Sequence, residues 1–370
     1  MVKIIAMAKE VTLYIDQNIP YSDVFFESLG LPISYFNDQD FDISSINEDA
    51  IVIIRSTYKT HNRDIPAKVN LICSVSTGED HVDKDHLQQK GIEYAFSTGA
   101  NAPAVTEYVL SSLALLLKDK LITPEDKFLI IGHGNIGSRV YTFLKNFGYS
   151  VDAYDPFSFS TIDNLDLLDQ YKLISLHVPL IHDGEHPTYN LVDSRFLERM
   201  GDSTFIINSS RGGVVKEKDF IRQNKVRIIT DVFENEPNVN RNFHNSAYLC
   251  TPHIAGHSQS ARFEMTHMAY QNVLRFLNIK EKEQKTLSLT RGLDFSKQLV
   301  EDDITKYGLP VSLFLNIYNP KKDCFSPEDF KIKRDSYNNR IGYNQADLSN
   351  NFDRKFEKFL SQLNIKTSYN

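Results

Sequence analysis

Short runs of apolar and β-branched residues alternate with longer stretches of helical spacing along residues 11–278. A first series of runs lies at residues 11–15, 33–36, 50–54, 71–75 and 92–96. A second series lies at residues 128–131, 151–154, 173–178, 204–208, 227–232 and 248–251. Such runs are typical of parallel strands buried on both faces of a sheet, with helices covering those faces. The pattern predicts an α/β protein with two Rossmann-like, doubly wound parallel sheets.

Three features divide the chain into domains. A helix expected at residues 102–118, apolar on most of its faces, separates the two series of strands. The second series has the six strands of a complete dinucleotide-binding sheet. A charged break at residues 279–285 is followed by a polar, Asn-rich segment. We therefore expect a flavodoxin-like substrate domain at 1–100 and 255–283, a Rossmann domain at 101–254, and a small α+β domain at 284–370.

The expected strand at 128–131 runs into a Gly-x-Gly-x-x-Gly motif that opens a helix. The motif contains Gly132, Gly134, Asn135, Ile136 and Gly137. Its first two glycines let the backbone approach a pyrophosphate, the third lets the helix pack on the strand, and the helix N-terminus offers unpaired N–H donors. The next strand ends at Asp155, whose carboxylate would bind the adenosine ribose and repel a 2′-phosphate. The sequence therefore predicts a dinucleotide site that prefers NAD to NADP.

Three polar clusters follow later strands of the second series, at the edge where open parallel sheets bind their ligands. They contain Ser209, Ser210 and Arg211, then Asp231 and Glu236, then His253, Gly256 and His257. Hydride transfer from a 2-hydroxy acid needs a base for the hydroxyl proton, a cation for the carboxylate and a group that holds the base in position. Histidine, arginine and glutamate can supply these functions, so the clusters predict an NAD-dependent dehydrogenase.

Composition excludes several other classes of protein. The formal net charge is -7 and both signs are interspersed, so we expect no nucleic acid partner. Residues 1–10 carry charge too early for a secretory leader, and no later run is long enough to span a membrane. The three cysteines are distant and odd in number, which favours reduced core thiols in a cytoplasmic protein. The sequence also lacks a recognised metal-ligand pair, a Gly-x-Ser-x-Gly elbow and a Walker loop, so we expect no metal, hydrolase or NTPase site.

Four motifs together resemble the D-isomer-specific 2-hydroxyacid dehydrogenases. They are Gly-x-Gly-x-x-Gly, Ser-Ser-Arg-Gly, Asp-Val-Phe-Glu-x-Glu-Pro and Pro-His-Ile-Ala-Gly, within a match at residues 50–278. The resemblance implies that Arg211 binds the substrate carboxylate, that His253 is the acid and base, and that Glu236 orients His253. It also implies cofactor contacts from Val178, Ser209, Ser210, Asp231 and Gly256.

Within this family the chain resembles a branch that oxidises a phosphorylated 2-hydroxy acid and carries an extra C-terminal dimerisation domain. Segments 14–21, 76–83 and 330–340 carry this likeness, which implies a homodimer. It also implies that the substrate is bound by Arg55, Ser56, Ser76, Thr77, Gly78 and His257. Because a phosphate dianion needs charge-assisted donors, we expect Arg55 to receive it, together with Lys59 or His257.

Two positions depart from the family pattern. Val178 stands where the family has a threonine that contacts the cofactor, and it lacks a hydrogen bond worth about 0.5–1.5 kcal/mol. His257 replaces a substrate-binding tyrosine, and it could pair with a phosphate or be a solvated histidine at a helix start. Two alternatives therefore stay open. One is a family member acting on glycerate or phosphoglycerate, and the other is an NAD(H)-sensing interaction protein that signals by domain closure without turnover.

Overall fold

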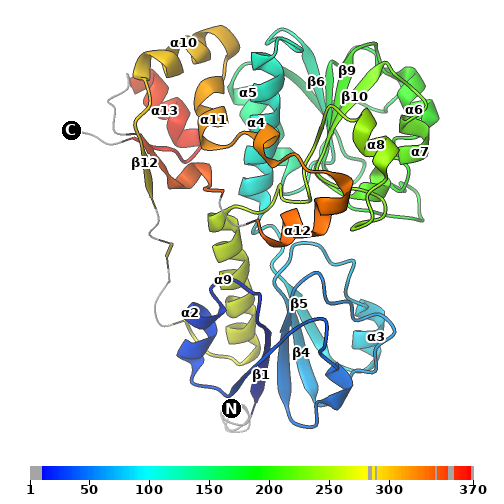
Figure 1. Cartoon of the computed structure of the whole chain (residues 1–370), viewed down its shortest axis with the longest axis vertical. Coiled ribbons are helices and arrows are strands. Elements are labelled where there is room, and N and C mark those ends of the chain that lie inside the picture. The colour runs from blue at the N-terminus through cyan, green and yellow to red at the C-terminus, as the bar shows by residue number, and fades with distance from the viewer. Residues whose placement is uncertain (1–10, 282–285, 288–289, 338–339, 349–353, 368–370) are drawn as a thin grey trace. The chain divides into compact units, whose positions relative to one another are not determined.

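The chain divides into two compact units, which Figure 1 shows in one view. The computed structural model describes residues 11–281, 286–287, 290–337, 340–348 and 354–367. One unit comprises Met1–Asn101 and Ser260–Ser288, and the other comprises Ala102–Gln259 and Leu289–Asn370. The expected boundary between residues 283 and 284 lies outside the described residues.

The first unit is built on a five-stranded parallel sheet. Its strands are β1 (Thr12–Asp16), β2 (Ile33–Phe36), β3 (Ala50–Ile54), β4 (Val69–Ser74) and β5 (Glu93–Phe96), in the order β2-β1-β3-β4-β5. This is the order of a flavodoxin-like sheet. Side chains of β3 alternate between two apolar clusters: Ile51 and Ile53 pack with Phe263 and Tyr270 of α9 (Gln259–Phe276), whereas Val52 lies in the cluster on the opposite face. Both faces are covered at the centre of the sheet, which is why the sequence of β3 is apolar throughout. The short helices α2 (Ser22–Phe26) and α3 (Lys84–Gln89) complete this unit.

The second unit contains a six-stranded parallel sheet. Its strands are β6 (Lys127–Ile131), β7 (Ser150–Tyr154), β8 (Leu173–Leu176), β9 (Thr204–Asn208), β10 (Val226–Thr230) and β11 (Leu249–Cys250), in the order β11-β10-β9-β8-β6-β7. The strand β6 pairs with β7 on one side and β8 on the other, so the direction of winding reverses at β6. Open parallel sheets bind ligands at the carboxyl ends of the strands at such a point.

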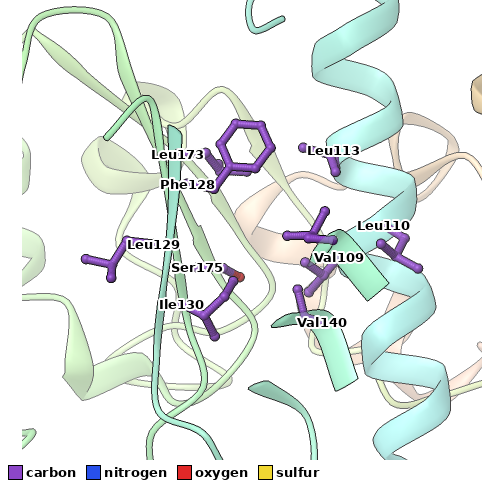
Figure 2. Close-up of a pocket in the computed structure, with 10 residues that line it drawn as sticks. Val109, Leu110, Leu113, Phe128, Leu129, Ile130, Val140, Leu173 and Ser175 are labelled. Atoms are coloured by element: carbon purple, nitrogen blue, oxygen red, sulfur yellow. The ribbon is translucent and has the colours of Figure 1, made fainter. Parts of the chain in front are cut away.

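Helices cover both faces of this second sheet. Phe128 and Ile130 pack with the helices α4 (Ala102–Lys118) and α5 (Gly137–Asn146), whereas Leu129 and Ile131 face the opposite cluster. That cluster includes residues of α6 (Ser194–Arg199), α7 (Glu217–Phe220) and α8 (Arg241–Ser246). Figure 2 shows a small void between α4 and the sheet, with a volume of about 10 Å³. Apart from Ser175 its lining is apolar, and it has room for no more than one water, so it is a packing defect and not a ligand site.

The C-terminal segment from Leu289 onward belongs to the second unit, and a separate domain at 284–370 stays a prediction. It contains α10 (Lys297–Tyr307), α11 (Val311–Ile317), α12 (Phe330–Asp335), α13 (Arg354–Gln362) and a parallel sheet of β12 (Arg291–Leu293), β13 (Ala346–Leu348) and β14 (Lys366–Thr367). Phe314 and Tyr343 share one continuous core with Leu113 of α4, and the Tyr343 hydroxyl lies 2.8 Å from Ser111 Oγ. This shared apolar core explains why the segment joins the nucleotide-binding sheet in one unit.

The α/β class and both parallel sheets are confirmed, while several ends differ from the prediction. The expected strands 173–178 and 227–232 end earlier, at Leu176 and Thr230, because the chain leaves the sheet there to form the loops described below. Of the cysteines expected in the core, Cys73 and Cys250 are buried but Cys324 is exposed. Within the described ranges, no helix combines the length and the apolar character that crossing a bilayer requires.

Candidate active site

The Gly-rich turn after β6 is shaped by two close backbone contacts. Gly132 has φ +90°, and a Cβ there would lie 2.4 Å from the carbonyl oxygen of His177. A Cβ on Gly137 would lie 1.8 Å from the carbonyl oxygen of Gly132. Gly134 differs, because a Cβ there would meet no protein atom within 4 Å. Packing therefore demands two of the glycines, and the third leaves open space beside the backbone, as the close approach of a pyrophosphate requires.

This contrast predicts that one alanine substitution lowers stability and that another weakens NADH binding. We expect Gly137→Ala to lower the free energy of unfolding by about 1–3 kcal/mol, because its methyl group overlaps the Gly132 carbonyl. We expect Gly134→Ala to leave stability unchanged and to weaken NADH binding about tenfold, which equals about 1.4 kcal/mol. Urea unfolding and NADH fluorescence titration measure the two quantities. Wild-type NADH affinity in Gly134→Ala would show that no phosphate lies against this turn.

Asp155 follows β7 and faces the same turn. Its carboxylate accepts hydrogen bonds from the backbone N–H groups of His133, at 2.8 Å, and Phe157, at 2.9 Å. Partial burial raises the pKa of this carboxyl, but the two backbone hydrogen bonds oppose burial and the net shift is downward. Asp155 is therefore an anion at neutral pH, held beside the Gly-rich turn. An anion there fits a free ribose diol and disfavours a 2′-phosphate.

The loop after β9 carries Arg211 and is organised by Asn208. The Asn208 side chain donates from Nδ2 to the Arg211 carbonyl at 3.0 Å, and its Oδ1 accepts from the Ser210 N–H at 3.1 Å and the Ser210 hydroxyl at 2.8 Å. The buried Ser209 hydroxyl has no hydrogen-bond partner in the described part of the chain, so it is available to a ligand. The Arg211 side chain is partly exposed and donates from Nη1 to the Ser210 carbonyl at 2.9 Å.

Two adjacent loops meet closely at Gly212. A Cβ there would lie 1.9 Å from the carbonyl oxygen of Phe233, so only glycine lets the Arg211 loop contact the loop that carries Glu236. The second loop is closed by a hydrogen bond from the Phe233 N–H to Glu236 Oε1 at 3.0 Å. Phe233 also packs against Phe330 of α12, with ring centroids 5.8 Å apart. The C-terminal segment thus supports the Glu236 loop directly.

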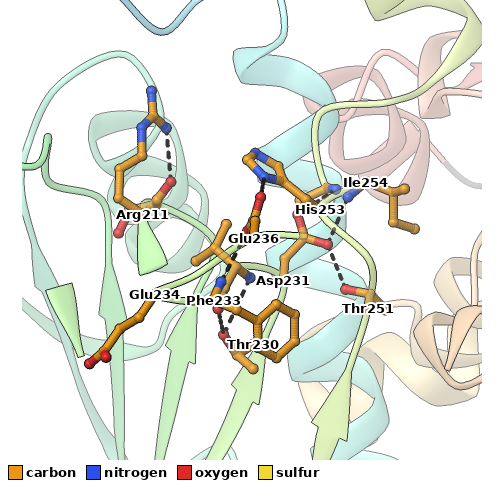
Figure 3. Close-up of polar contacts among 12 residues, drawn as sticks. Arg211, Thr230, Asp231, Phe233, Glu234, Glu236, Thr251, His253 and Ile254 are labelled. Atoms are coloured by element: carbon orange, nitrogen blue, oxygen red, sulfur yellow. Dashed lines mark hydrogen bonds and ion pairs between the residues drawn. The ribbon is translucent and has the colours of Figure 1, made fainter. Parts of the chain in front are cut away.

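Glu236 and His253 form a hydrogen-bonded pair, shown in Figure 3. His253 Nδ1 lies 2.6 Å from Glu236 Oε2, and the two side chains are 31% and 18% exposed. Burial raises the pKa of Glu236, but the charge of His253, its hydrogen bond and the charge of Arg334 outweigh burial and lower it. Glu236 is therefore ionised at neutral pH and fixes the imidazole through Nδ1. The other ring nitrogen, Nε2, makes no hydrogen bond to any described residue, so it is available to a substrate.

The backbone at His253 has φ 55°, a left-handed conformation that is rare for residues other than glycine. The turn that follows is held by Asp231, whose carboxylate accepts from the Ile254 and Ala255 N–H groups at 2.8 Å each and from Thr251 Oγ1 at 2.6 Å. Burial raises the pKa of Asp231 to about 6, against the lowering influence of His253 and these donors. Asp231 is thus largely ionised at neutral pH and anchors the His253 turn, a role that the sequence did not indicate.

The first unit carries most of the residues expected to bind substrate. Arg55 is engaged with two carboxylates: Nε lies 2.7 Å from the fully buried Asp16, and Nη2 lies 3.1 Å from Asp38. Ser56 is exposed, whereas the Ser76 hydroxyl donates to the Gly78 carbonyl at 2.9 Å and lies 2.8 Å from the Ser74 hydroxyl. Thr77 and Gly78 are partly exposed in the same turn. The carboxylates orient Arg55 but leave its cluster without net positive charge.

The other expected residues lie in the second unit. Val178 follows β8 and packs beside Gly132, where its Cγ1 would lie 3.0 Å from a Cβ. Gly256 is buried and His257 is partly exposed in the turn after His253, and the His257 N–H donates to the Ile254 carbonyl at 2.8 Å. The described residues contain no group of three or more histidine, cysteine, aspartate or glutamate side chains arranged to bind a metal. In the second unit, His253, Arg211 and the Gly-rich turn all follow strands of one parallel sheet.

Sequence comparison agrees with this arrangement. Residues 120–255 match the family model described as "D-isomer specific 2-hydroxyacid dehydrogenase, NAD binding domain". A curated protein of Chromohalobacter salexigens, named erythronate-4-phosphate dehydrogenase, is 32% identical over 74% of this chain and 74% of its own. A protein of the same name from a Marinomonas species is 30% identical over 90% of this chain and 96% of its own.

Solved structures share the fold. A glyoxylate reductase from Paecilomyes thermophila has a TM-score of 0.61 at 20% identity, covering 73% of this chain and 95% of its own. An NAD-dependent formate dehydrogenase from Staphylococcus aureus, solved in complex with NAD, has a TM-score of 0.60 at 20% identity and covers 72% of this chain and 96% of its own. These structures match almost entirely while leaving about a quarter of this chain uncovered. The Marinomonas protein covers most of that remainder.

Proposed function

This chain belongs to the D-isomer-specific 2-hydroxyacid dehydrogenases, which makes it an NAD-dependent oxidoreductase, and we propose that it oxidises 4-phospho-D-erythronate to (R)-3-hydroxy-2-oxo-4-phosphooxybutanoate in the synthesis of pyridoxal 5′-phosphate. Two observations support this substrate. The curated relatives carry the name erythronate-4-phosphate dehydrogenase, and one of them covers 90% of this chain, whereas the glyoxylate reductase structure covers 73%. The observation that carries the chemistry is the pair of His253 and Glu236 in the unit that contains the Gly-rich turn.

The proposed mechanism assigns one task to each residue. His253 takes the proton of the substrate 2-hydroxyl at Nε2, because Nδ1 is held by Glu236. The Glu236 carboxylate stabilises the imidazolium that results, and its lowered pKa keeps it charged for this purpose. Arg211 binds the substrate carboxylate with its planar fork and stabilises the developing carbonyl oxygen. NAD, when bound, accepts the hydride from C2.

The turnover assay that tests this function follows NADH absorbance with three substrates: 4-phospho-D-erythronate, D-glycerate and 3-phospho-D-glycerate. We expect kcat/KM to be highest for 4-phospho-D-erythronate. A 2-oxo acid is included as an electron acceptor, so that tightly held NADH does not conceal turnover. Preference for either glycerate would keep the enzyme class and replace the substrate. NADH binding without sustained turnover of any of them would favour a sensor.

Phosphate recognition is proposed to involve Arg55, whose Nη1 is not used in the pairs with Asp16 and Asp38. Replacing Arg55 with methionine is expected to weaken binding of 4-phospho-D-erythronate about tenfold, since a charge-assisted hydrogen bond contributes about 1.5–3 kcal/mol. Binding of unphosphorylated erythronate should change less. Because the substitution also leaves buried Asp16 unpaired, the free energy of unfolding is measured alongside. Equal losses for both ligands would remove Arg55 from the phosphate site.

The remaining substrate contacts are proposed for Ser56, Ser76, Thr77, Gly78 and His257. We also propose a cytoplasmic homodimer formed through the C-terminal segment. The exposed Leu299 and Ile332 of that segment support an interface, and the free cysteines are compatible with a reducing compartment. Sedimentation equilibrium should give twice the 42.5 kDa mass of one chain. A concentration-independent mass of one chain would rule out the dimer.

A further inference from the structure

Arg340 lies far along the chain from the catalytic motifs, yet its side chain is buried beside the turn that follows His253. The side chain is 1% exposed. Its Nη2 donates to the carbonyl of Ala104 in the first turn of α4, at 2.6 Å, and to the carbonyl of Ala255, at 3.1 Å. Its backbone carbonyl accepts a hydrogen bond from the N–H of Gln259 at 2.9 Å. One residue therefore contacts both the beginning and the end of residues 255–259.

Both backbone polar groups of Ala255 are held by hydrogen bonds. Its N–H donates to Asp231, which belongs to the loop after β10, and its carbonyl accepts from Arg340. Asp231 also holds the N–H of Ile254, directly after His253. A non-glycine residue at φ 55° carries a backbone cost on the order of 1–2 kcal/mol, and such conformations persist only where their surroundings hold them. Arg340 and Asp231 supply that support to His253.

We propose that Arg340 is a positioning residue for hydride transfer: by holding the turn at residues 253–259 it keeps His253 in the backbone conformation that pairs its imidazole with Glu236. The inference rests on the proposed role of His253 as the base. It gives the C-terminal segment a part in the chemistry of its own chain, separate from the proposed dimer contact. It also separates Arg340 from Arg211, because Arg340 is buried and touches no reacting atom.

The surroundings of Arg340 are those of an anchor and not of a simple stabilising ion pair. Its nearest carboxylate oxygen, Glu107 Oε2, lies 3.7 Å from Nη2, and burial raises the pKa of Glu107 to about 7 although Arg340 lowers it. The guanidinium also lies over the ring of Tyr318, 4.3 Å from its centroid. Nε and Nη1 have no hydrogen-bond partner within the described residues. Burying an incompletely paired charge is unfavourable, and apolar side chains fill such a site at least as stably. The two carbonyl contacts are the function that an apolar residue could not replace.

The test compares four variants of the full-length enzyme. Arg340→Met removes the anchor, and the double variant with Glu107→Gln removes it without leaving a buried carboxylate unpaired. Arg195→Met makes the same chemical change at an exposed position of the same unit and is the control. We expect both Arg340 variants to bind NADH as the wild type does and to lose about 100-fold in kcat, the effect of a misplacement of about 1 Å. Arg340→Lys, which keeps the charge and N–H donors, should recover part of the loss.

A second readout follows the His253 ring directly by NMR of 13C-labelled histidine, with its signal assigned from a His253→Asn sample. We expect this signal to move in the Arg340 variants and to stay unchanged in Arg195→Met. The measurement tests Arg340 even if the proposed substrate is wrong. A folded double variant with kcat within threefold of wild type and an unmoved His253 signal overturns the proposal. If neither methionine variant folds, the decision passes to Arg340→Lys: a folded enzyme with wild-type kcat and an unmoved signal contradicts the proposal, and reduced kcat with a moved signal supports it.

Discussion

Replacing His253 with asparagine is expected to lower kcat about 1000-fold, within the range of about 10²–10⁴ that general acid and base catalysis contributes. Asparagine is the appropriate replacement because it adopts positive φ more readily than most residues, and His253 has φ 55°. The backbone of the turn should therefore survive while the proton acceptor is lost. Steady-state kinetics gives kcat, and fluorescence titration should show an unchanged NADH dissociation constant.

The pH dependence distinguishes loss of the base from a general disturbance of the site. In the wild type, a protonated imidazole cannot accept the hydroxyl proton, so kcat for oxidation should fall in acid. The residual rate of His253→Asn should lack this acidic limb. His182→Asn, at an exposed position of the same unit, is the matched control and should retain both the rate and the limb. If His253→Asn keeps more than a tenth of the wild-type kcat and still loses activity in acid, proton transfer belongs to another group.

Much of the fold could be predicted because the central strands are buried on both faces. The fully buried strands β3 and β9 occupy the expected ranges, since an apolar run in such a strand begins and ends with burial. The edge strand β2 also occupies its expected range, although two of its four residues are exposed. The structure of the C-terminal segment was harder to predict from the sequence. Its sheet is formed by the short strands β12, β13 and β14, and its core contacts reach back to α4 through residues such as Phe314. Such long-range packing produces no local period in the sequence, so only the charged break at residues 279–285 and the family resemblance pointed to this segment.

The candidate site was likewise predictable only in part. The Gly-rich turn, Arg211, Glu236 and His253 could be proposed from the sequence because each lies in a short motif directly after a strand. The contacts that hold these residues in place could not be predicted from the sequence. The contact between Phe330 and Phe233 joins segments that are far apart in the sequence, and no local sequence pattern predicts it. The left-handed backbone at His253 could not be predicted either. Positive φ is usually marked by glycine, and this position is a histidine.

Arg211→Lys is expected to lower kcat/KM about 100-fold, equivalent to about 2.7 kcal/mol at about 1.4 kcal/mol per tenfold change. Lysine keeps the positive charge but cannot present two parallel N–H groups to a carboxylate, so one charge-assisted hydrogen bond of about 1.5–3 kcal/mol is lost. The backbone should not respond, because Asn208 holds the Arg211 carbonyl and Gly212 contacts Phe233 independently of the side chain. The loss should therefore appear in both KM and kcat, with NADH affinity and the free energy of unfolding unchanged.

Arg222→Lys is the matched control, because Arg222 is exposed in the same unit. Comparing substrates with and without a phosphate provides a further distinction. If Arg211 binds the carboxylate, every 2-hydroxy acid should lose the same factor, whether or not it carries a phosphate, because all of them share that group. A loss confined to phosphorylated substrates would instead place Arg211 at the phosphate. Such a result would reverse the orientation of the substrate and would make Ser76 and the turn at Gly78 the groups to replace next.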